Sequence, residues 1–303
     1  MNKAKIWLEA FRLRTLPLAF SCIIVGNALA FIEGEFSYFV FALTLLTALF
    51  LQVLSNLAND YGDSQKGTDN ENRVGPERTV QKGDIKPKAM KTAIIIFVLL
   101  SLASGITLII RGLSNISLNI KLLFLLLGIA GIIAAIKYTV GKKAFGYHGF
   151  GDLFVFIFFG LVGVIGSYYL HSHKFDFLIL LPAASIGFLS TGVLNLNNIR
   201  DIKNDKISGK NTIPVKLGEK TAKIYHAILL ILAIVCIIIY VFIKYESLYQ
   251  LAFLVVVPLI IANIISIFKV RESKDYDKLL KPLAITTFVF SVVFSLGLII
   301  SYV

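Results

Sequence analysis

The stretch NLANDYGDSQKGTDNENRVGPERT, residues 56–79, decides how this chain is interpreted. It follows directly on a long apolar run and places Asn59, Asp60 and Asp63 at the end of that run. Acids that continue an apolar helix are costly inside a membrane and mark a functional site by default. The stretch therefore raises two questions: whether the apolar run spans a membrane, and what its acidic end binds.

The composition is that of a membrane protein. The 303 residues are 57% hydrophobic with a mean hydropathy of +0.81, whereas soluble domains are about 45–50% apolar. The apolar residues gather in stretches long enough to cross roughly 30 Å of hydrocarbon as helices. We expect an all-α membrane protein, because no alternating strand pattern occurs. The nine expected transmembrane helices are 15–32, 36–57, 92–110, 122–139, 152–170, 175–198, 224–243, 248–268 and 282–303.

The basic residues predict how the helices are oriented. If the N-terminus is cytoplasmic and the spans alternate, all but four of the 30 Lys and Arg residues lie in cytoplasmic segments. This bias follows the positive-inside rule and predicts a multi-pass protein of the cell inner (cytoplasmic) membrane, with its active site facing the cytoplasm. The net charge of +12 is thereby explained mostly by topology, so we expect no nucleic-acid partner. The four exceptions are Arg111, Lys121, Lys174 and Lys244.

Two long cytoplasmic loops stand out. Residues 58–91, between the second and third spans, and 199–223, between the sixth and seventh, mix acids and bases with Gly and Asn. Long loops in a compact protein are usually functional or disordered. Here the polar sequence begins before the preceding helix ends, which favours a functional loop. We expect the loops to form a cytoplasmic cap on one transmembrane domain that comprises residues 1–303.

The ends of the second and sixth spans resemble each other. The four-residue spacing of Asn59 and Asp63 recurs in Asn197 and Asp201, and a further step of four reaches Asp205. The tetrapeptides NLAN at 56–59 and NLNN at 195–198 strengthen the likeness. The pattern indicates an internal duplication that would place the two helix ends opposite each other across a cavity. Chance is the alternative for so short a repeat.

The acids at these ends suit a hard divalent cation. Side chains four residues apart share one helix face, so each end presents a cluster of oxygens. Neighbouring carboxylates raise one another's pKa unless cations lie between them. Oxygen ligands without His or Cys favour Mg²⁺ and argue against zinc. The candidate magnesium ligands are Asn59, Asp60, Asp63, Asp69, Asn197, Asp201 and Asp205.

Basic side chains on the same membrane face would bind phosphate oxygens. Acids that hold Mg²⁺ together with bases that hold phosphate describe a diphosphate site. For any single lysine, the alternative is an ordinary solvated loop charge. The candidate diphosphate-binding residues are Lys66, Arg73, Arg78, Lys142, Lys143 and Lys210.

Over essentially its whole length, the chain resembles the UbiA superfamily of intramembrane aromatic prenyltransferases. The resemblance is carried by NDYGDSQKGTD at 59–69, RVGPERT at 73–79 and NNIRDIKND at 197–205. The GPERT segment and the block GYHGFGDLFVFIFFG at 146–160 favour the branch that uses 1,4-dihydroxy-2-naphthoate. Many members carry a third Asp where this chain has Gly67, and Asp69 is the candidate to replace it.

The resemblance implies nine helices around a central cavity that opens to membrane lipid. It also implies Mg²⁺-dependent transfer of a polyprenyl group from polyprenyl diphosphate to 1,4-dihydroxy-2-naphthoate. Loss of CO₂ and a proton would give demethylmenaquinol, a step of menaquinone biosynthesis. Asp63, Asp201 and Asp205 would act catalytically, by stabilising the diphosphate leaving group through Mg²⁺.

Three further residues have roles that the resemblance suggests. Tyr138, at the end of the fourth span, is the candidate to face the allylic cation, and its alternative is an interfacial tyrosine. Arg14 and Thr15, at the start of the first span, are candidates for binding the acceptor's carboxylate. For Arg14 the alternatives are a membrane anchor or a diphosphate ligand.

Two other functions compete with this one. The first is the same chemistry on another aromatic acceptor, such as 4-hydroxybenzoate or homogentisate. The second is an ion-coupled transporter, whose acidic site would lie near the bilayer midplane on interrupted helices. The acids of this chain lie instead at the predicted inner boundary, which favours the prenyltransferase.

Overall fold

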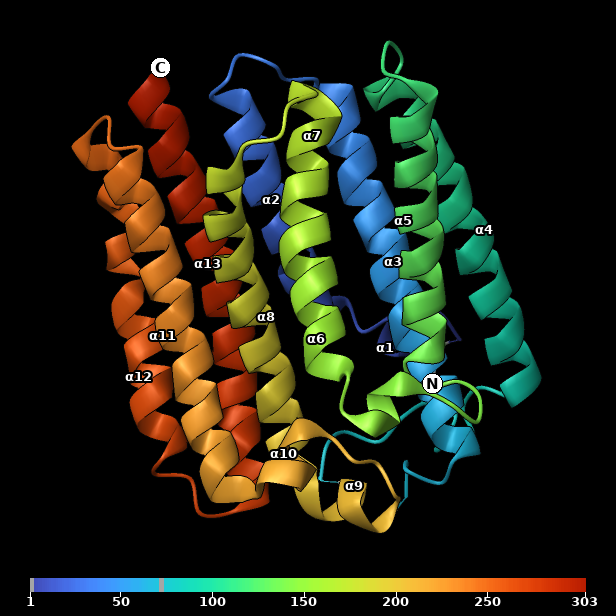
Figure 1. Cartoon of the computed structure of the whole chain (residues 1–303). Helices are drawn as coiled ribbons and strands as arrows, with labels where there is room; N and C mark the ends of the chain where they lie inside the picture. The colour runs from blue at the N-terminus through green and yellow to red at the C-terminus, as the bar shows by residue number, and fades with distance from the viewer. Residues whose placement is uncertain (1–2, 71–73) are drawn as a thin grey trace.

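The computed structural model describes residues 3–70 and 74–303, so Arg73 lies outside the described residues. The described residues form helices and turns, with no strand among them. Figure 1 shows the long helices packed side by side in one bundle. The α-helices are α1 (Lys3–Phe11), α2 (Leu16–Phe31), α3 (Tyr38–Gln65), α4 (Pro87–Gly112), α5 (Leu118–Lys137), α6 (Gly151–Val155), α7 (Gly166–Ser172), α8 (Leu180–Arg200), α9 (Ile202–Ile207), α10 (Ile213–Leu217), α11 (Glu219–Ile243), α12 (Val257–Ile267) and α13 (Asp277–Tyr302).

Shorter helical segments complete several of these elements. A π-helical segment, Phe156–Ile165, joins α6 to α7 without a break, so residues 151–172 form one continuous span. The 3-10 segments are Leu13–Thr15, Phe145–His148, Phe177–Ile179, Leu248–Val255 and Ser273–Tyr276.

The expected membrane spans are confirmed. Nine helical segments of the described chain are long and apolar enough to cross a membrane, and each coincides with one of the predicted stretches. Their outer surfaces expose large apolar side chains such as Leu126, Phe242 and Val255, as lipid-facing helices do. The protein is therefore an all-α, multi-pass membrane protein.

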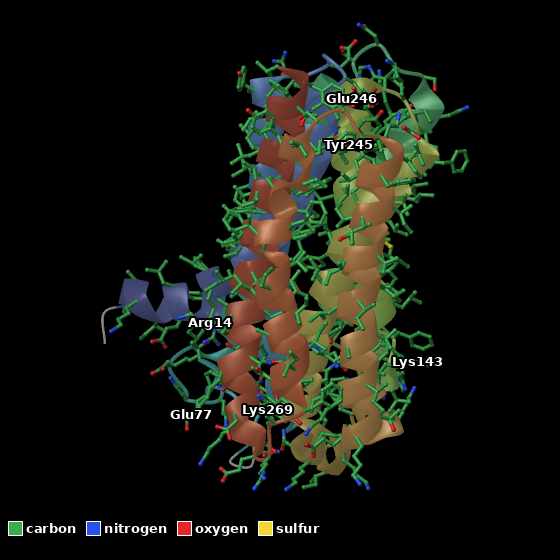
Figure 2. All side chains as sticks on the ribbon, turned by 90° about the vertical axis from the view of Figure 1, so that its left-hand side faces the viewer. Arg14, Glu77, Lys143, Tyr245, Glu246 and Lys269 are labelled. Atoms are coloured by element: carbon green, nitrogen blue, oxygen red, sulfur yellow. The ribbon has the colours of Figure 1, made fainter. Side chains whose placement is uncertain are left out.

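The N-terminal helix α1 departs from the direction of the bundle. Figure 2 shows it projecting sideways, close to the level of Arg14. Arg12, between α1 and the next turn, has φ 50°, in the left-handed region that ends helices, and Pro17 lies in the first turn of α2. The ring of Phe11 packs edge-on against Phe97 of α4, with the centroids 5.3 Å apart, so α1 is attached to the bundle by apolar contact.

Small residues let the helices at the centre approach closely. The helix α8 packs against α11, α13 and the π-helical segment. A Cβ atom on Gly160 would lie 2.8 Å from the Cα atom of Gly187, so no larger side chain fits at this crossing. Close packing of this kind holds the end of α8 in a defined position.

The two repeated motifs are anchored in the same way. Asn56, in α3, donates its side-chain amide to the carbonyl oxygen of Phe11 over 2.9 Å. Asn195, in α8, donates its amide to the carbonyl oxygen of Ala222 over 3.2 Å. Both first asparagines of NLAN and NLNN therefore tie their helix to a neighbouring segment, which supports the internal duplication.

Candidate active site

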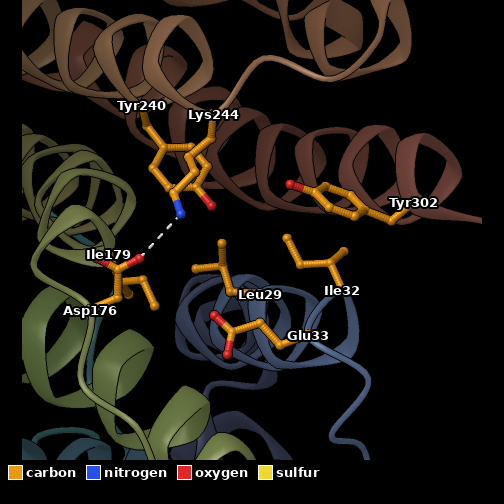
Figure 3. Close-up of a pocket in the computed structure, with 8 residues that line it drawn as sticks. All are labelled: Leu29, Ile32, Glu33, Asp176, Ile179, Tyr240, Lys244 and Tyr302. Atoms are coloured by element: carbon orange, nitrogen blue, oxygen red, sulfur yellow. Dashed lines mark ion pairs between the residues drawn. The ribbon is translucent and has the colours of Figure 1, made fainter.

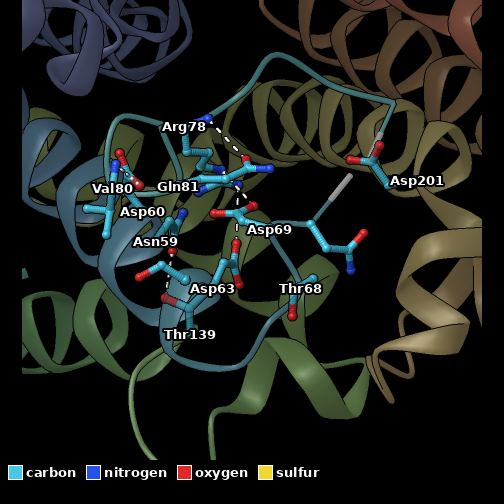
Figure 4. Close-up of polar contacts among 12 residues, drawn as sticks. Asn59, Asp60, Asp63, Thr68, Asp69, Arg78, Val80, Gln81, Thr139 and Asp201 are labelled. Carbon is cyan, nitrogen blue, oxygen red and sulfur yellow. Dashed lines mark hydrogen bonds and ion pairs between the residues drawn. The ribbon is translucent and has the colours of Figure 1, made fainter. Parts of the chain in front are cut away.

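The first acidic cluster lies on the last turns of α3. This helix continues beyond its apolar stretch to Gln65, so the polar residues belong to the helix itself. The Asp63 carboxylate accepts a hydrogen bond from the Tyr147 hydroxyl over 2.8 Å and forms an ion pair with Arg78 at 3.1 Å. Figure 4 shows Asp63, Asp69 and Arg78 gathered beneath the loop that follows α3.

Arg78 joins two carboxylates. Its Nη2 atom is 3.1 Å from Asp63, and its Nε atom is 3.3 Å from Asp69. The guanidinium side chain is only 9% exposed. Burial by itself lowers the pKa of Arg78, but the carboxylates of Asp63 and Asp69 outweigh burial and raise it above its ordinary value. Arg78 is therefore a fixed cation between the two acids.

Asp60 and Asn59 have structural partners. Asp60 accepts hydrogen bonds from the Thr79 hydroxyl over 2.6 Å and from the backbone N–H groups of Thr79 and Val80. It thereby holds the segment that carries Arg78. The Asn59 side-chain oxygen accepts from the Thr139 hydroxyl over 3.2 Å. Their predicted role as magnesium ligands stays a prediction.

The four-residue spacing predicts one continuous helix for the second acidic cluster, but the structure has a break there. Helix α8 ends at Arg200, Asp201 forms its C-cap, and α9 begins at Ile202. The Arg200 guanidinium binds the Asp201 carboxylate over 2.7 Å and also contacts Asn197 and Asp277. This network explains the break, because it fixes Asp201 at the helix end. Asp205 keeps only a local link to Asp201, through its N–H group and the Asp201 carbonyl.

Asp205 pairs with Lys210. The Lys210 ammonium lies 3.6 Å from one carboxylate oxygen, and both side chains are more than 90% buried. The other oxygen, Oδ2, is buried and has no hydrogen-bond partner among the described residues. Burial raises the pKa of Asp205 to about 6, helped by Asp201 and Asp63 and opposed by Lys210. Asp63 belongs to the other cluster, so the two clusters share one electrostatic environment.

Direct contacts confirm that the two helix ends converge. The Asn204 side-chain amide, in α9, donates to the carbonyl oxygen of Thr68, in the loop after α3, over 2.8 Å. The Tyr147 ring lies under two ammonium groups, 3.7 Å from that of Lys66 and 5.7 Å from that of Lys210. The clusters therefore meet around Tyr147. Burial and the neighbouring Asp63 raise the pKa of Tyr147 above its ordinary value, so the hydroxyl stays a proton donor.

Sequence reasoning missed Tyr147, Asn204 and Arg200. Asn204 stands within the quoted motif NNIRDIKND, and Tyr147 lies between two glycines in GYHGFG. The flanking glycines are the sequence signal that points to Tyr147. Arg200 is adjacent to Asp201, but adjacency in sequence does not predict that the two side chains pair.

Tyr138 lies at the edge of the acid–base cluster. It follows the last residue of α5, and its ring meets Phe145 edge-on, with the centroids 5.5 Å apart. The rings of Phe145 and Phe154 stack at 3.9 Å, and Phe158 continues this aromatic row. Burial raises the pKa of Tyr138 to about 12, with Lys210, Asp152, Asp63 and Asp205 as its charged neighbours.

Other predicted site residues lie apart from this cluster. Lys142 and Lys143 are exposed, and Figure 2 shows Lys143 at the outer surface of the bundle. Arg14 is exposed as well. The Thr15 hydroxyl donates to the carbonyl oxygen of Arg12 and accepts from the amides of Gln52 and Asn56. The binding roles of Lys142, Lys143, Arg14 and Thr15 stay predictions.

The donor set suits magnesium but is not arranged as a ready-made cage. In the part of the chain that the structure describes, no three His, Cys, Asp or Glu side chains lie together in a metal-binding group. Arg78 pairs with Asp63 and Asp69, and Lys210 pairs with Asp205. The candidate ligands are carboxylate and amide oxygens, and within the described residues the buried Oδ2 atom of Asp205 and Oδ1 atom of Asn204 have no hydrogen-bond partners. Such oxygens fit a hard cation.

One cavity of the described structure lies elsewhere. It measures ≈ 90 Å³ and is bounded by the ion pair of Asp176 with Lys244, as Figure 3 shows. Glu33 and Tyr302 also line it. Tyr302 is the last residue of α13, and Figure 1 shows the C-terminal end of α13 at the end of the bundle opposite to α9. None of the predicted site residues borders this cavity.

Comparison with known proteins relates the whole chain to one family. Residues 19–299 match the UbiA prenyltransferase family. A 1,4-dihydroxy-2-naphthoate octaprenyltransferase of Haemophilus influenzae is 43% identical over 99% of this chain and 97% of its own length. A protein of the same name from Escherichia coli is 47% identical over 86% of this chain and 84% of its own.

Solved structures agree on the fold. The apo structure of a UbiA homologue from Aeropyrum pernix K1 has a TM-score of 0.70 at 16% identity, over 97% of this chain and 99% of that one. A UbiA homologue from Archaeoglobus fulgidus bound to DMAPP and Mg²⁺ has a TM-score of 0.63 at 21% identity, over 97% and 98%. At these identities the likeness concerns the fold. With the family match and the two close relatives, it establishes that this chain belongs to the UbiA prenyltransferase family.

Proposed function

We propose that the chain transfers a polyprenyl group from polyprenyl diphosphate to 1,4-dihydroxy-2-naphthoate, with loss of CO₂, to give demethylmenaquinol for menaquinone synthesis. The observation that carries the proposal is the meeting of two acid–base clusters at one end of the bundle, joined by the hydrogen bond between Asn204 and Thr68. The names of the relatives from Haemophilus influenzae and Escherichia coli support this acceptor. We infer that residues 1–303 form one domain.

The bases of the site would bind the diphosphate. Arg78 presents several N–H groups from one rigid plane, which suits phosphate oxygens, and Lys210 adds a compact charge. Both are already buried beside the acids, so little ordering remains when the diphosphate enters. Lys66, above the Tyr147 ring, would neutralise charge at the open side.

The acids of the site would hold Mg²⁺. We assign Asp63, Asp69 and Asp205 as the principal ligands, with Asp201 and Asn197 nearby and held by Arg200. Bound there, Mg²⁺ would supply positive charge that stabilises the departing diphosphate. Asn59 and Asp60 would act mainly by holding Thr139 and the segment of Thr79 in place.

The prenyl chain and its cation need an apolar lining. Tyr138, Phe145, Phe154 and Phe158 form a row of aromatic rings that leads away from the acid–base cluster. Their π faces would stabilise an allylic cation and exclude water from it. The exposed apolar helix surfaces give the rest of the chain access to lipid.

The site would face the cytoplasm of a bacterial-type inner membrane. The described loop residues 66–70, 74–86, 138–150 and 201–218 lie at the same end of the bundle, the lower end in Figure 1, and they carry most of the loop lysines and arginines. The positive-inside rule places that end on the cytoplasmic side.

One experiment tests the function. Purified protein is given 1,4-dihydroxy-2-naphthoate, a mixture of prenyl diphosphates and Mg²⁺, and the products are identified by mass spectrometry with CO₂ release measured in parallel. We expect a prenylated, decarboxylated naphthoquinol, and no product in the presence of EDTA. In parallel reactions, 4-hydroxybenzoate or homogentisate is supplied as the acceptor. If one of these is prenylated and the naphthoate is not, the assigned acceptor is wrong. If no prenyl diphosphate is consumed with any acceptor, the proposal is refuted.

Matched variants connect that activity to the site. Asp63→Ala and Asp201→Ala should each abolish transfer while the protein remains folded in detergent. Asp84→Ala is the control, because Asp84 is an exposed acid in the same loop as Arg78. Near wild-type turnover in a folded Asp63→Ala protein would remove the assignment of the magnesium ligands.

A further inference from the structure

Asp152 is a buried acid that the site described above does not use. It lies in the first turn of α6 and is 6% exposed. Its Oδ2 atom is buried and has no hydrogen-bond partner among the described residues. A buried carboxylate oxygen without a donor is costly, so such an atom calls for an explanation in terms of function.

Two other helices surround Asp152 with hydroxyl groups. The Tyr225 hydroxyl, in α11, hydrogen-bonds the Asp152 carboxyl. The Thr191 hydroxyl, in α8, lies 3.5 Å from the Asp152 carbonyl oxygen. The carboxyl group is therefore held from one direction by Tyr225 and leaves one oxygen without a donor.

Tyr138 connects Asp152 to the acid–base cluster. A Cβ atom on Gly151, next to Asp152, would lie 2.9 Å from the Tyr138 hydroxyl oxygen. Tyr138 also has Lys210, Asp63 and Asp205 as charged neighbours. Tyr138 therefore borders both the residue next to Asp152 and the charged groups of the acid–base cluster.

We propose that Asp152 is the base that carries the acceptor's proton during prenyl transfer, with Tyr225 as its positioning residue. The inference rests on the proposed function. The acceptor ring would lie beside Tyr138, with the hydroxyl adjacent to its carboxyl-bearing carbon directed at the Asp152 Oδ2 atom.

The reaction balances with the two substrates and Asp152, and it needs no further reagent. Asp152 takes the hydroxyl proton, and the electron pair left on that oxygen makes the carboxyl-bearing ring carbon nucleophilic. This carbon forms a bond to the allylic carbon as the bond between the allylic carbon and the diphosphate oxygen breaks. The ring carbon then carries both the prenyl group and the carboxylate, beside a keto group. The carboxylate leaves as CO₂, its electron pair regenerates the enolate, and the proton returns from Asp152 to the oxygen. Asp152 ends as it began.

The test compares Asp152→Asn with Asp152→Glu. Asparagine keeps the size and the acceptor oxygen for Tyr225 but cannot take a proton, whereas glutamate keeps the base at a longer reach. We expect Asp152→Asn to lower kcat about 10²–10⁴-fold, the usual contribution of a general base, and Asp152→Glu to lose less. Binding of prenyl diphosphate with Mg²⁺, measured by calorimetry, should match the wild type in both. The exposed Asp84→Asn is the matched control and should keep wild-type kcat.

The reverse order of activities would overturn the proposal, because a purely structural Asp152 tolerates asparagine better than glutamate. Parallel loss of diphosphate binding in Asp152→Asn would overturn it as well. If Asp152→Asn does not fold, Tyr225→Phe decides: kcat should fall about tenfold with the KM for prenyl diphosphate unchanged, and wild-type kcat would refute the role. If the wild-type protein forms no naphthoquinol, the proposed function is wrong. If only the variants behave differently from expectation, the role of Asp152 is wrong, so the two outcomes are distinguishable.

Discussion

The Asn204 side-chain amide donates a hydrogen bond to the Thr68 carbonyl oxygen over 2.8 Å, and so joins two segments that lie 136 positions apart in the chain. Thr68 lies in the motif at 59–69, and Asn204 lies in the motif at 197–205. The bond therefore helps to fix the distance between Arg78, with Asp63 and Asp69, and the ion pair of Asp205 with Lys210. A diphosphate that contacts both bases needs that distance to be constant.

Removal of this bond should weaken substrate binding more than it weakens the fold. Asn204→Ala deletes one buried hydrogen bond, worth about 1 kcal/mol, which corresponds to about a fivefold increase in the KM for prenyl diphosphate. Kinetics at saturating acceptor measure the change. Asn119→Ala, at an exposed position at the other end of the bundle, is the control. An unchanged KM would show that the two segments are held together by other contacts.

Arg78 should be needed for stability as well as for binding. Arg78→Ala removes the guanidinium that pairs with the buried Asp63 and Asp69, and removing one partner of a buried ion pair costs about 3–5 kcal/mol. We expect a lower Tm, measured by thermal unfolding in detergent, that Mg²⁺ partly restores. Arg78→Lys should unfold at a higher temperature than Arg78→Ala but still transfer poorly, because one ammonium cannot replace two guanidinium contacts. A Tm of Arg78→Ala that does not respond to Mg²⁺ would contradict the ligand assignment.

Tyr147→Phe tests the hydrogen bond to Asp63 separately from the aromatic ring. The substitution removes the hydroxyl that lies 2.8 Å from Asp63 but keeps the ring beneath Lys66 and Lys210. Without its donor, Asp63 is held less firmly, and we expect a several-fold higher Mg²⁺ requirement with only a small change in Tm. Titration of activity with Mg²⁺ gives the result. Tyr147→Leu should lower activity further, since it also removes the contacts with the two lysines.

Gly75 should not accept a side chain. A Cβ atom there would lie 2.5 Å from the Nη2 atom of Arg200, so alanine would displace the guanidinium that holds Asp201 and Asn197. We expect Gly75→Ala to reduce transfer at least tenfold, as misplacement of a supporting group does. Gly105→Ala, on α4, has no atom within 4 Å of the added carbon and is the matched control. Equal activity of the two variants would show that Arg200 can move without effect.

The sequence predicts the helices well because the membrane imposes a length and an apolar composition on every span. All nine spans follow from that constraint, and so does the position of the acids at the end of α3. Repetition of the Asn–Asp spacing also predicts correctly that two helix ends converge, as the contact of Asn204 with Thr68 confirms.

The partners of each acid are beyond prediction from the sequence. Asp60 and Asp63 are three positions apart in one helix, yet one binds the segment of Thr79 and the other binds Arg78. No glycine or proline marks the break after Arg200, where the Arg200 side chain pairs with Asp277, 77 positions along the chain. Such choices depend on which loop folds over which helix end, and local propensity does not encode them.

Because Arg78 and Lys210 already pair with Asp63, Asp69 and Asp205, the two ligands of the site should bind cooperatively. A divalent cation that takes the carboxylates frees the two bases, and a diphosphate that takes the bases frees the carboxylates. Each ligand would thus remove the competitor of the other, and the resulting coupling free energy is the same whichever binds first. Such an enzyme binds the divalent cation or the diphosphate weakly when either is alone, and it binds both tightly when they are present together.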